Sequence, residues 1–244
     1  MLRILDARTG EPVDAALSRH GLVRVHARPP GSGITGLRVL LVADVLVRAL
    51  EIGGNTVWAT LTSAPDPAAS RGGAGLRAHA AELGIRPFED HRDTEEGPTA
   101  AWTVDVVAQG AATTDGPRVE VAPVDSGSAP VPGDPTALRL ALLARRRDLP
   151  LSLDAGVLAE AEDTLGRWRA AVAGWAARPS RPVPEDVRLR LRAAWEGDLD
   201  VPAVLDVLRS VEDSDIPEGA RFETYAYADR LLGLELTREI GAAL

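Results

Sequence analysis

The stretch between residues 22 and 62 constrains the fold of this 244-residue chain more than any other part. Residues 22–27 form a short β-branched run that is typical of a strand. After a glycine-rich turn, residues 37–52 carry apolar side chains at spacings of three and four, which predicts a helix. The glycines at 53 and 54 would end this helix, and residues 55–62 are typical of a second strand. We therefore expect one βαβ crossover with parallel strands.

The rest of the first half carries weaker signals. Residues 76–83 predict a short helix, and residues 102–108 and 118–124 alternate enough to be strands. A turn at Asp115-Gly116 would pair these two strands as a hairpin. Residues 123–133 hold three prolines and two glycines and are the best candidate for a linker.

The second half changes to a helical pattern. Five helices are predicted, over residues 134–147, 154–175, 184–195, 201–211 and 219–232. Trp168, Trp175 and Trp195 follow the apolar stripes, so we expect them in the core of a helical bundle. The expected domains are therefore residues 1–133 and 134–244.

The composition excludes several kinds of chemistry. The chain has no cysteine, which removes disulfides, thiolate nucleophiles and cysteine-bound zinc. All 27 basic residues are arginine, so mechanisms that need a lysine are excluded as well. The four histidines are too dispersed along the sequence to indicate a metal site. The net charge of −9 argues against broad binding of nucleic-acid phosphates. These features make tRNA an unexpected partner.

We expect a soluble, cytoplasmic protein. The first 17 residues carry five charges and contain no apolar segment of the signal-peptide type. The most apolar run, residues 39–50, contains Asp44 and Arg48 and is too short to span a membrane. No membrane contact is therefore predicted.

The glycine-rich turn is the strongest candidate for a binding site. Residues 31–36 match the pattern G-x-G-x-x-G between a predicted strand and a predicted helix. Glycines let a phosphate approach the backbone, and the helix N-terminus supplies free N–H groups. The candidate nucleotide-binding residues are His26, Arg28, Gly31, Gly33, Thr35, Gly36 and Arg38.

Other interpretations of the turn stay open. For NAD binding, the four residues 27–30 make the turn too long, and the ribose-binding acid would have to be Asp66 in a proline-rich loop. The turn could instead be purely structural, with His26 filling the end of a strand and Arg38 solvated. No catalytic residue and no metal ligand is assigned.

Several segments resemble the cysteinyl-tRNA synthetases and their relative, the cysteine ligase of mycothiol synthesis. Residues 2–10 (LRILDARTG) resemble the family's LxLYDTxTG, and residues 25–29 (VHARP) stand where it has YVCGP. Residues 33–38 (GITGLR) stand where it has HIGHxR, and residues 42–50 (VADVLVRAL) resemble xFDxLxRxL.

The resemblance continues in family order through the second half. Residues 81–87 resemble ADxLGIxPP, and residues 134–143 resemble DPxxLRxxLLS. Residues 198–202 and 229–234 resemble the family's DDLNTP and DRxLGL. The resemblance implies the α/β class: a Rossmann-like parallel sheet, a trimmed class I synthetase-type nucleotide-binding fold, followed by an α-helical bundle.

The departures from the family concern its chemistry. Gly33 and Gly36 replace the two histidines of HIGH, which in the family stabilise the ATP phosphates during adenylation. The lysine-containing KMSKS loop cannot exist here, and residues 125–133 take its place. Ala27 stands at the first cysteine ligand of the family's zinc, so no zinc is expected.

We therefore expect a non-aminoacylating paralogue that acts by binding. ATP or another adenine nucleotide, another small molecule, or a protein is the expected partner. The alternatives are a nucleotide-dependent enzyme with altered chemistry and a protein-interaction scaffold without a small ligand. The two dense basic clusters, residues 145–147 and the arginines at 188, 190 and 192, are expected to be solvated helix faces rather than a tRNA surface.

Overall fold

The computed structural model describes residues 1–18, 20–62, 72–90, 102–111, 116–127 and 133–242. The chain forms two compact units: Met1–Gly127 with Arg147–Leu153, and Ser128–Arg146 with Asp154–Leu244. Among the described helices, none is both long and apolar enough to cross a membrane.

The first unit is built on a five-stranded parallel sheet. Its strands are β3 (Leu22–Arg28), β4 (Thr56–Leu61), β5 (Glu89–Asp90), β6 (Trp102–Ala108) and β7 (Arg118–Val121). They lie in the order β5-β4-β3-β6-β7, and every neighbouring pair is parallel. The α/β Rossmann-like sheet and the parallel pairing of the first two predicted strands are confirmed.

The order of the strands creates a switch point. The chain passes outward from β3 to β4 and β5, and then returns to the other side of β3 to form β6. In open α/β sheets, ligands bind outside the carboxyl ends of the strands where the order reverses in this way. The end of β3 beside β6 is therefore the place to look for a site.

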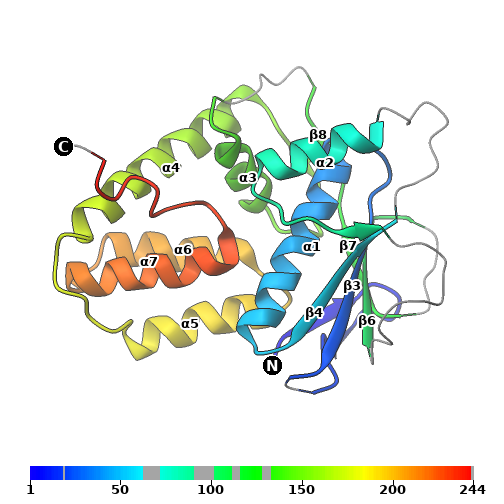
Figure 1. Cartoon of the computed structure of the whole chain (residues 1–244), viewed down its shortest axis with the longest axis horizontal. Helices are drawn as coiled ribbons and strands as arrows, with labels where there is room; N and C mark the ends of the chain where they lie inside the picture. Colours follow the sequence, from blue (N-terminus) through cyan, green and yellow to red (C-terminus); the bar gives the residue numbers. More distant parts are fainter. Residues whose placement is uncertain (19, 63–71, 91–101, 112–115, 128–132, 243–244) are drawn as a thin grey trace. The chain divides into compact units, whose positions relative to one another are not determined.

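The two faces of this sheet differ in polarity. Val23, Val25 and Ala27 of β3 are buried, and α1 (Ile34–Ile52) packs against β3, β4, β6 and β7 (Figure 1). Side chains alternate along a strand, so Arg24, His26 and Arg28 belong to the opposite face. α2 (Gly72–Glu82) packs against α1.

The connection between β6 and β7 is different from our prediction. The two strands are parallel, with Asp105 beside Arg118, so the hairpin expected at Asp115-Gly116 is wrong. A two-residue turn can only join antiparallel strands. Asp115 itself lies outside the described residues.

Short strands complete the first unit. β1 (Arg3–Asp6) and β2 (Glu11–Asp14) pair antiparallel. β8 (Val124–Asp125) pairs in parallel with β9 (Leu151–Ser152), so the start of the expected linker is a strand.

The second unit is helical in its described part, as expected. Its helices are α3 (Pro135–Leu143), α4 (Ala155–Trp175), α5 (Glu185–Glu196), α6 (Val201–Glu212) and α7 (Glu218–Leu232) (Figure 1). Four of them match the predicted bounds within two residues, whereas α3 ends four residues before the predicted end.

The tryptophans of the second unit lie in its core, which confirms the prediction. Trp168, Trp175 and Trp195 are all buried. The ring of Tyr225 contacts Trp168 and Trp175 edge to face, with centroid distances of 5.7 and 5.1 Å. Such aromatic pairs add to the stabilisation from buried area.

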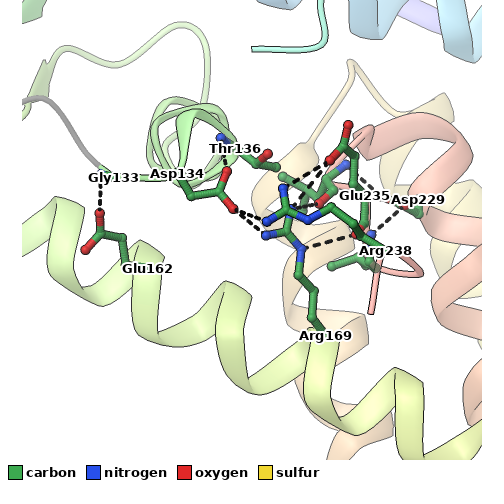
Figure 2. A network of polar contacts seen from close by, with 10 residues as sticks. Gly133, Asp134, Thr136, Glu162, Arg169, Asp229, Glu235 and Arg238 are labelled. Carbon is green, nitrogen blue, oxygen red and sulfur yellow. Dashed lines mark hydrogen bonds and ion pairs between the residues drawn. The ribbon is translucent and has the colours of Figure 1, made fainter. Parts of the chain in front are cut away.

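A polar network holds the segment that follows α7 (Figure 2). Arg169 is buried on α4 and donates to the carbonyls of Leu234 and Glu235, at 2.9 and 3.1 Å. It also pairs with Asp134 at 2.5 Å, the residue that caps α3 by accepting from the Thr136 amide. Asp229 accepts from two amides of the same segment, so one network joins α3, α4 and α7.

Candidate functional site

The candidate site starts at the carboxyl end of β3, where the glycine-rich turn leads into α1. Gly33 is the N-cap of α1, and no side chain caps the helix there. The first turn of α1 contains no acidic residue. An α-helix leaves its first amides without intrahelical acceptors, and these amides favour an anion.

The backbone of the turn is open at two of its glycines. A Cβ atom built on Gly31 or Gly33 would meet no heavy atom within 4 Å. Both glycines therefore leave room beside the backbone, which is the condition for close approach of a phosphate. The structural interpretation does not require a glycine at either position.

Gly36, in contrast, is required by packing. A Cβ atom at this position would lie 2.1 Å from the carbonyl oxygen of Gly31 and 3.4 Å from the Cβ of Pro29. The turn folds back onto the first turn of α1, and only a glycine permits this approach. The third glycine of the pattern thus shapes the turn.

Two further candidate residues hold the turn in place. The Thr35 hydroxyl accepts from the Val124 amide at 3.0 Å and donates to its carbonyl at 3.5 Å, which joins α1 to β8. Arg38 is fully buried and donates to the carbonyls of Ala122 and Leu149, at 3.2 and 3.0 Å. Arg38 is therefore not solvated, because its guanidinium binds backbone within the unit.

His26 and Arg28 lie on the polar face of the sheet. His26 is buried, and its Nε2 lies 2.8 Å from Oγ1 of Thr62, just beyond β4. Arg28 Nε donates to Oδ1 of Asp105 on β6 at 3.1 Å. These contacts cross from β3 to both neighbouring strands, so they lie around the switch point.

The same face holds other polar groups that the sequence analysis missed. The Arg24 guanidinium lies 4.2 Å from the centroid of the Trp58 ring, and Trp58 Nε1 donates to Glu89 at 2.8 Å. Thr60 is buried beside His26, and in the described part of the chain its hydroxyl has no hydrogen-bond partner. The alternation of Arg24, His26 and Arg28 along β3 was the available signal for this face.

Ala27 stands at the position of the family's first zinc ligand. Ala27 offers no ligand atom, and the described residues contain no group of three His, Cys, Asp or Glu side chains that could hold a metal. Asp66 and most of the segment in the KMSKS place, residues 128–132, lie outside the described residues.

The basic clusters are largely paired within their own units. Arg146 lies 3.8 and 3.5 Å from carboxylate oxygens of Asp198 and Asp200. Arg147 is buried and donates to the Glu120 carbonyl, so the expectation that it lies on a solvated helix face is wrong. Helix α3 ends before this residue, and the chain there returns to the first unit.

On α5, two of the three arginines have partners on the same helix. Arg188 pairs with Glu185 and Arg192 with Glu196. The cluster therefore presents less uncompensated positive charge than its sequence suggests.

Comparison with known proteins gives a partial match to one group of enzymes. No protein-family profile matches the chain. The L-cysteine:1D-myo-inositol 2-amino-2-deoxy-α-D-glucopyranoside ligase of Segniliparus rotundus is 39% identical over 109 residues, which is 43% of this chain and 25% of the ligase. The Streptomyces griseus enzyme of the same name is 41% identical over 109 residues, 42% of this chain and 25% of the ligase. The enzyme of the same name from Thermobispora bispora is 43% identical over 75 residues, which is 31% of this chain and 18% of that enzyme.

These matches confirm the resemblance to a cysteine ligase related to the cysteinyl-tRNA synthetases. The chain spans about a quarter of the length of the ligases that it matches.

Proposed function

We propose that this chain binds an adenine nucleotide at the carboxyl end of β3 and does not activate cysteine. The observation that carries the proposal is the bare turn: Gly31 and Gly33 leave the backbone open beside the uncapped N-terminus of α1. This turn lies at the switch point of a Rossmann-like sheet, where such folds bind ligands.

The choice of an adenine nucleotide rests on the relatives. The matched proteins are ligases, and the resemblance to cysteinyl-tRNA synthetases implies ATP as their energy source. A helix N-terminus and an open glycine backbone suit the phosphates of such a ligand. NAD is less well supported, because residues 27–30 make the turn longer than that of a dinucleotide-binding fingerprint.

The absence of cysteine activation rests on side chains that the sequence lacks. Gly33 and Gly36 have no side chain that could donate to a developing charge as the two histidines of the family motif do. Loss of one such donor typically costs roughly 3 kcal/mol of transition-state stabilisation. The chain also has no lysine for the second motif and no cysteine for a zinc site.

One contact favours the second candidate, a nucleotide-dependent enzyme with altered chemistry. His26 Nε2 lies 2.8 Å from the Thr62 hydroxyl at the carboxyl end of the sheet. A histidine within hydrogen-bond distance of a hydroxyl is the arrangement that activates a nucleophile. Turnover of ATP that disappears in His26→Asn would favour this candidate over a binding role.

The proposal is tested by titrating the protein with ATP, AMP, adenosine and NAD in a calorimeter. Gly33→Asp is the most informative variant. Aspartate is a good N-cap and fits the extended backbone of this position (φ −75°, ψ −179°), so the fold should be kept. Its carboxylate would occupy the first amides of α1 and repel phosphate.

Gly33→Ser is the matched control, because serine caps the helix without adding charge. We expect ATP to bind the unaltered protein, with an affinity that falls at least tenfold in Gly33→Asp and clearly less in Gly33→Ser. Equal ATP affinity in Gly33→Asp and the unaltered protein would overturn the proposed site. Absence of binding by every nucleotide would favour a protein-interaction scaffold.

A further inference from the structure

Among the described residues, the Arg28 guanidinium is held by one side chain, Asp105. Its Nε donates to Asp105 Oδ1 at 3.1 Å, and within the described part of the chain its Nη1 and Nη2 make no hydrogen bond. Arg8 shows the contrast, because its Nε and Nη2 both donate to Asp6. The Arg28 side chain therefore keeps the outer edge of its guanidinium available.

The acceptor for Arg28 is a fixed carboxylate. The Asp105 side chain is only 5% exposed and lies on β6 beside His26 of β3, whereas the Arg28 side chain is 46% exposed. A buried acceptor thus orients a half-exposed guanidinium across the junction of β3 and β6. This junction is the switch point of the sheet.

The two Nη groups, which make no hydrogen bond to any described residue, define the class of ligand that Arg28 would bind. A guanidinium has five N–H donors in a planar fork, and its Nη1–Nη2 edge matches two oxygens of one phosphoryl or carboxylate group. Holding the Nε in advance reduces the side-chain entropy lost on binding. Arg28 also stands where the family motif YVCGP has a glycine, so this cation is an addition in the present chain.

We infer that Arg28 binds a phosphoryl group of the ligand through its Nη1–Nη2 edge and that Asp105 is the residue that positions it. The inference rests on the proposed nucleotide function and names the side chain that would replace the missing phosphate-binding groups.

The test uses calorimetric titration with pyrophosphate, ATP and adenosine. Arg28→Gln should lower the affinity for pyrophosphate and ATP about tenfold or more, because charge-assisted hydrogen bonds are lost. The affinity of Arg28→Lys should lie between those of the unaltered protein and Arg28→Gln, since lysine keeps the charge but lacks the planar fork of N–H donors.

Arg77→Gln is the matched control. The Arg77 side chain lies in the same unit, is 45% exposed, and already donates from both Nη atoms to Asp90. Arg77→Gln removes one positive charge of similar exposure away from the proposed site. The affinity for pyrophosphate should therefore change by no more than about twofold, which is the effect of general electrostatics. Equal losses in Arg28→Gln and Arg77→Gln would overturn the inference.

A positioning role of Asp105 can be distinguished from a structural one by measuring pyrophosphate affinity with and without Arg28. Asp105→Asn should weaken pyrophosphate binding in the unaltered background and have no further effect on binding in Arg28→Gln. An equal loss of affinity in both backgrounds would show that Asp105 does not act through Arg28.

The outcomes separate this inference from the proposed function. ATP binding that is indifferent to Arg28 leaves the proposed function standing and overturns the inference. If pyrophosphate binding depends on Arg28 and ATP binds no more tightly than pyrophosphate, the inference is supported. The same result would contradict the proposal that the ligand is an adenine nucleotide. Absence of binding by pyrophosphate and ATP overturns both.

Discussion

A Cβ atom on Gly36 would lie 2.1 Å from the carbonyl oxygen of Gly31, so these two glycines of one turn have different roles. Gly36 lets the turn pack against the first turn of α1. Gly31, whose own Cβ position is open, leaves the backbone accessible. The turn is thus partly structural and partly available for a ligand.

Gly36→Ala should destabilise the first unit. Replacing a helical glycine by alanine normally stabilises a protein by roughly 1 kcal/mol, but here the new methyl group overlaps a backbone oxygen. We expect a net loss of about 1–3 kcal/mol, measured by urea unfolding. Gly31→Ala is the control and should unfold like the unaltered protein. A gain of stability in Gly36→Ala would contradict the close packing of Gly36 against Gly31.

Arg38→Met should be destabilising as well. The buried guanidinium donates to the carbonyls of Ala122 and Leu149, and methionine would leave both without this donor. A buried acceptor that loses its partner costs about 1–3 kcal/mol. The exposed Arg190 provides the control variant Arg190→Met, for which no measurable change is expected. If both variants unfold at the same urea concentration, Arg38 does not hold the turn.

Asp134 should make the second unit sensitive to acid. Burial raises the pKa of Asp134, but hydrogen bonds from Arg169 and Thr136 lower it by more, so the pKa lies below its ordinary value of 3.8. A carboxylate with a lowered pKa in the folded state contributes stability above the unfolded value, and this is lost as the pH falls through the folded pKa. The loss should therefore occur below pH 3.8.

Asp134→Asn measures this contribution. Asparagine is also a good N-cap, so the variant removes the charge and keeps the cap. We expect it to unfold about 1–3 kcal/mol more easily at neutral pH, and the difference to shrink in acid below the ordinary pKa. A difference that is the same at pH 7 and pH 3 would show that the pair with Arg169 contributes nothing through charge.

Of these variants, Trp168→Ala should lower the free energy of unfolding most, and it should do so in the second unit. The side chain is fully buried, contacts Tyr225 and donates from Nε1 to Glu212 at 2.9 Å. Truncation of a buried tryptophan costs about 3–5 kcal/mol. Near-ultraviolet circular dichroism during urea unfolding measures the change, and a loss below about 1 kcal/mol would be incompatible with a core position.

The sequence was sufficient to find the elements with strong periodicity. The βαβ crossover followed from α1 and its flanking strands, and the bundle followed from the apolar stripes that contain Trp168 and Trp195. Elements of two residues, such as β8 and β9, carry no such period, because they form only where two distant segments meet.

The candidate site could be predicted only in part for the same reason. The pattern of residues 31–36 located the turn, but it could not show that Gly36 packs against Gly31. The partner of Arg28 was hidden because Asp105 is 77 residues away, and their contact depends on β3 lying beside β6. The order of strands in a sheet is set by tertiary packing, which local patterns do not record.

Binding of an adenine nucleotide and absence of cysteine activation can be measured together in this chain. The most direct test measures ATP binding by calorimetry and cysteine-dependent exchange between ATP and pyrophosphate on the same purified sample. We expect saturable binding of ATP and no exchange above the level without cysteine. Exchange that depends on cysteine, or the absence of ATP binding, would contradict this expectation.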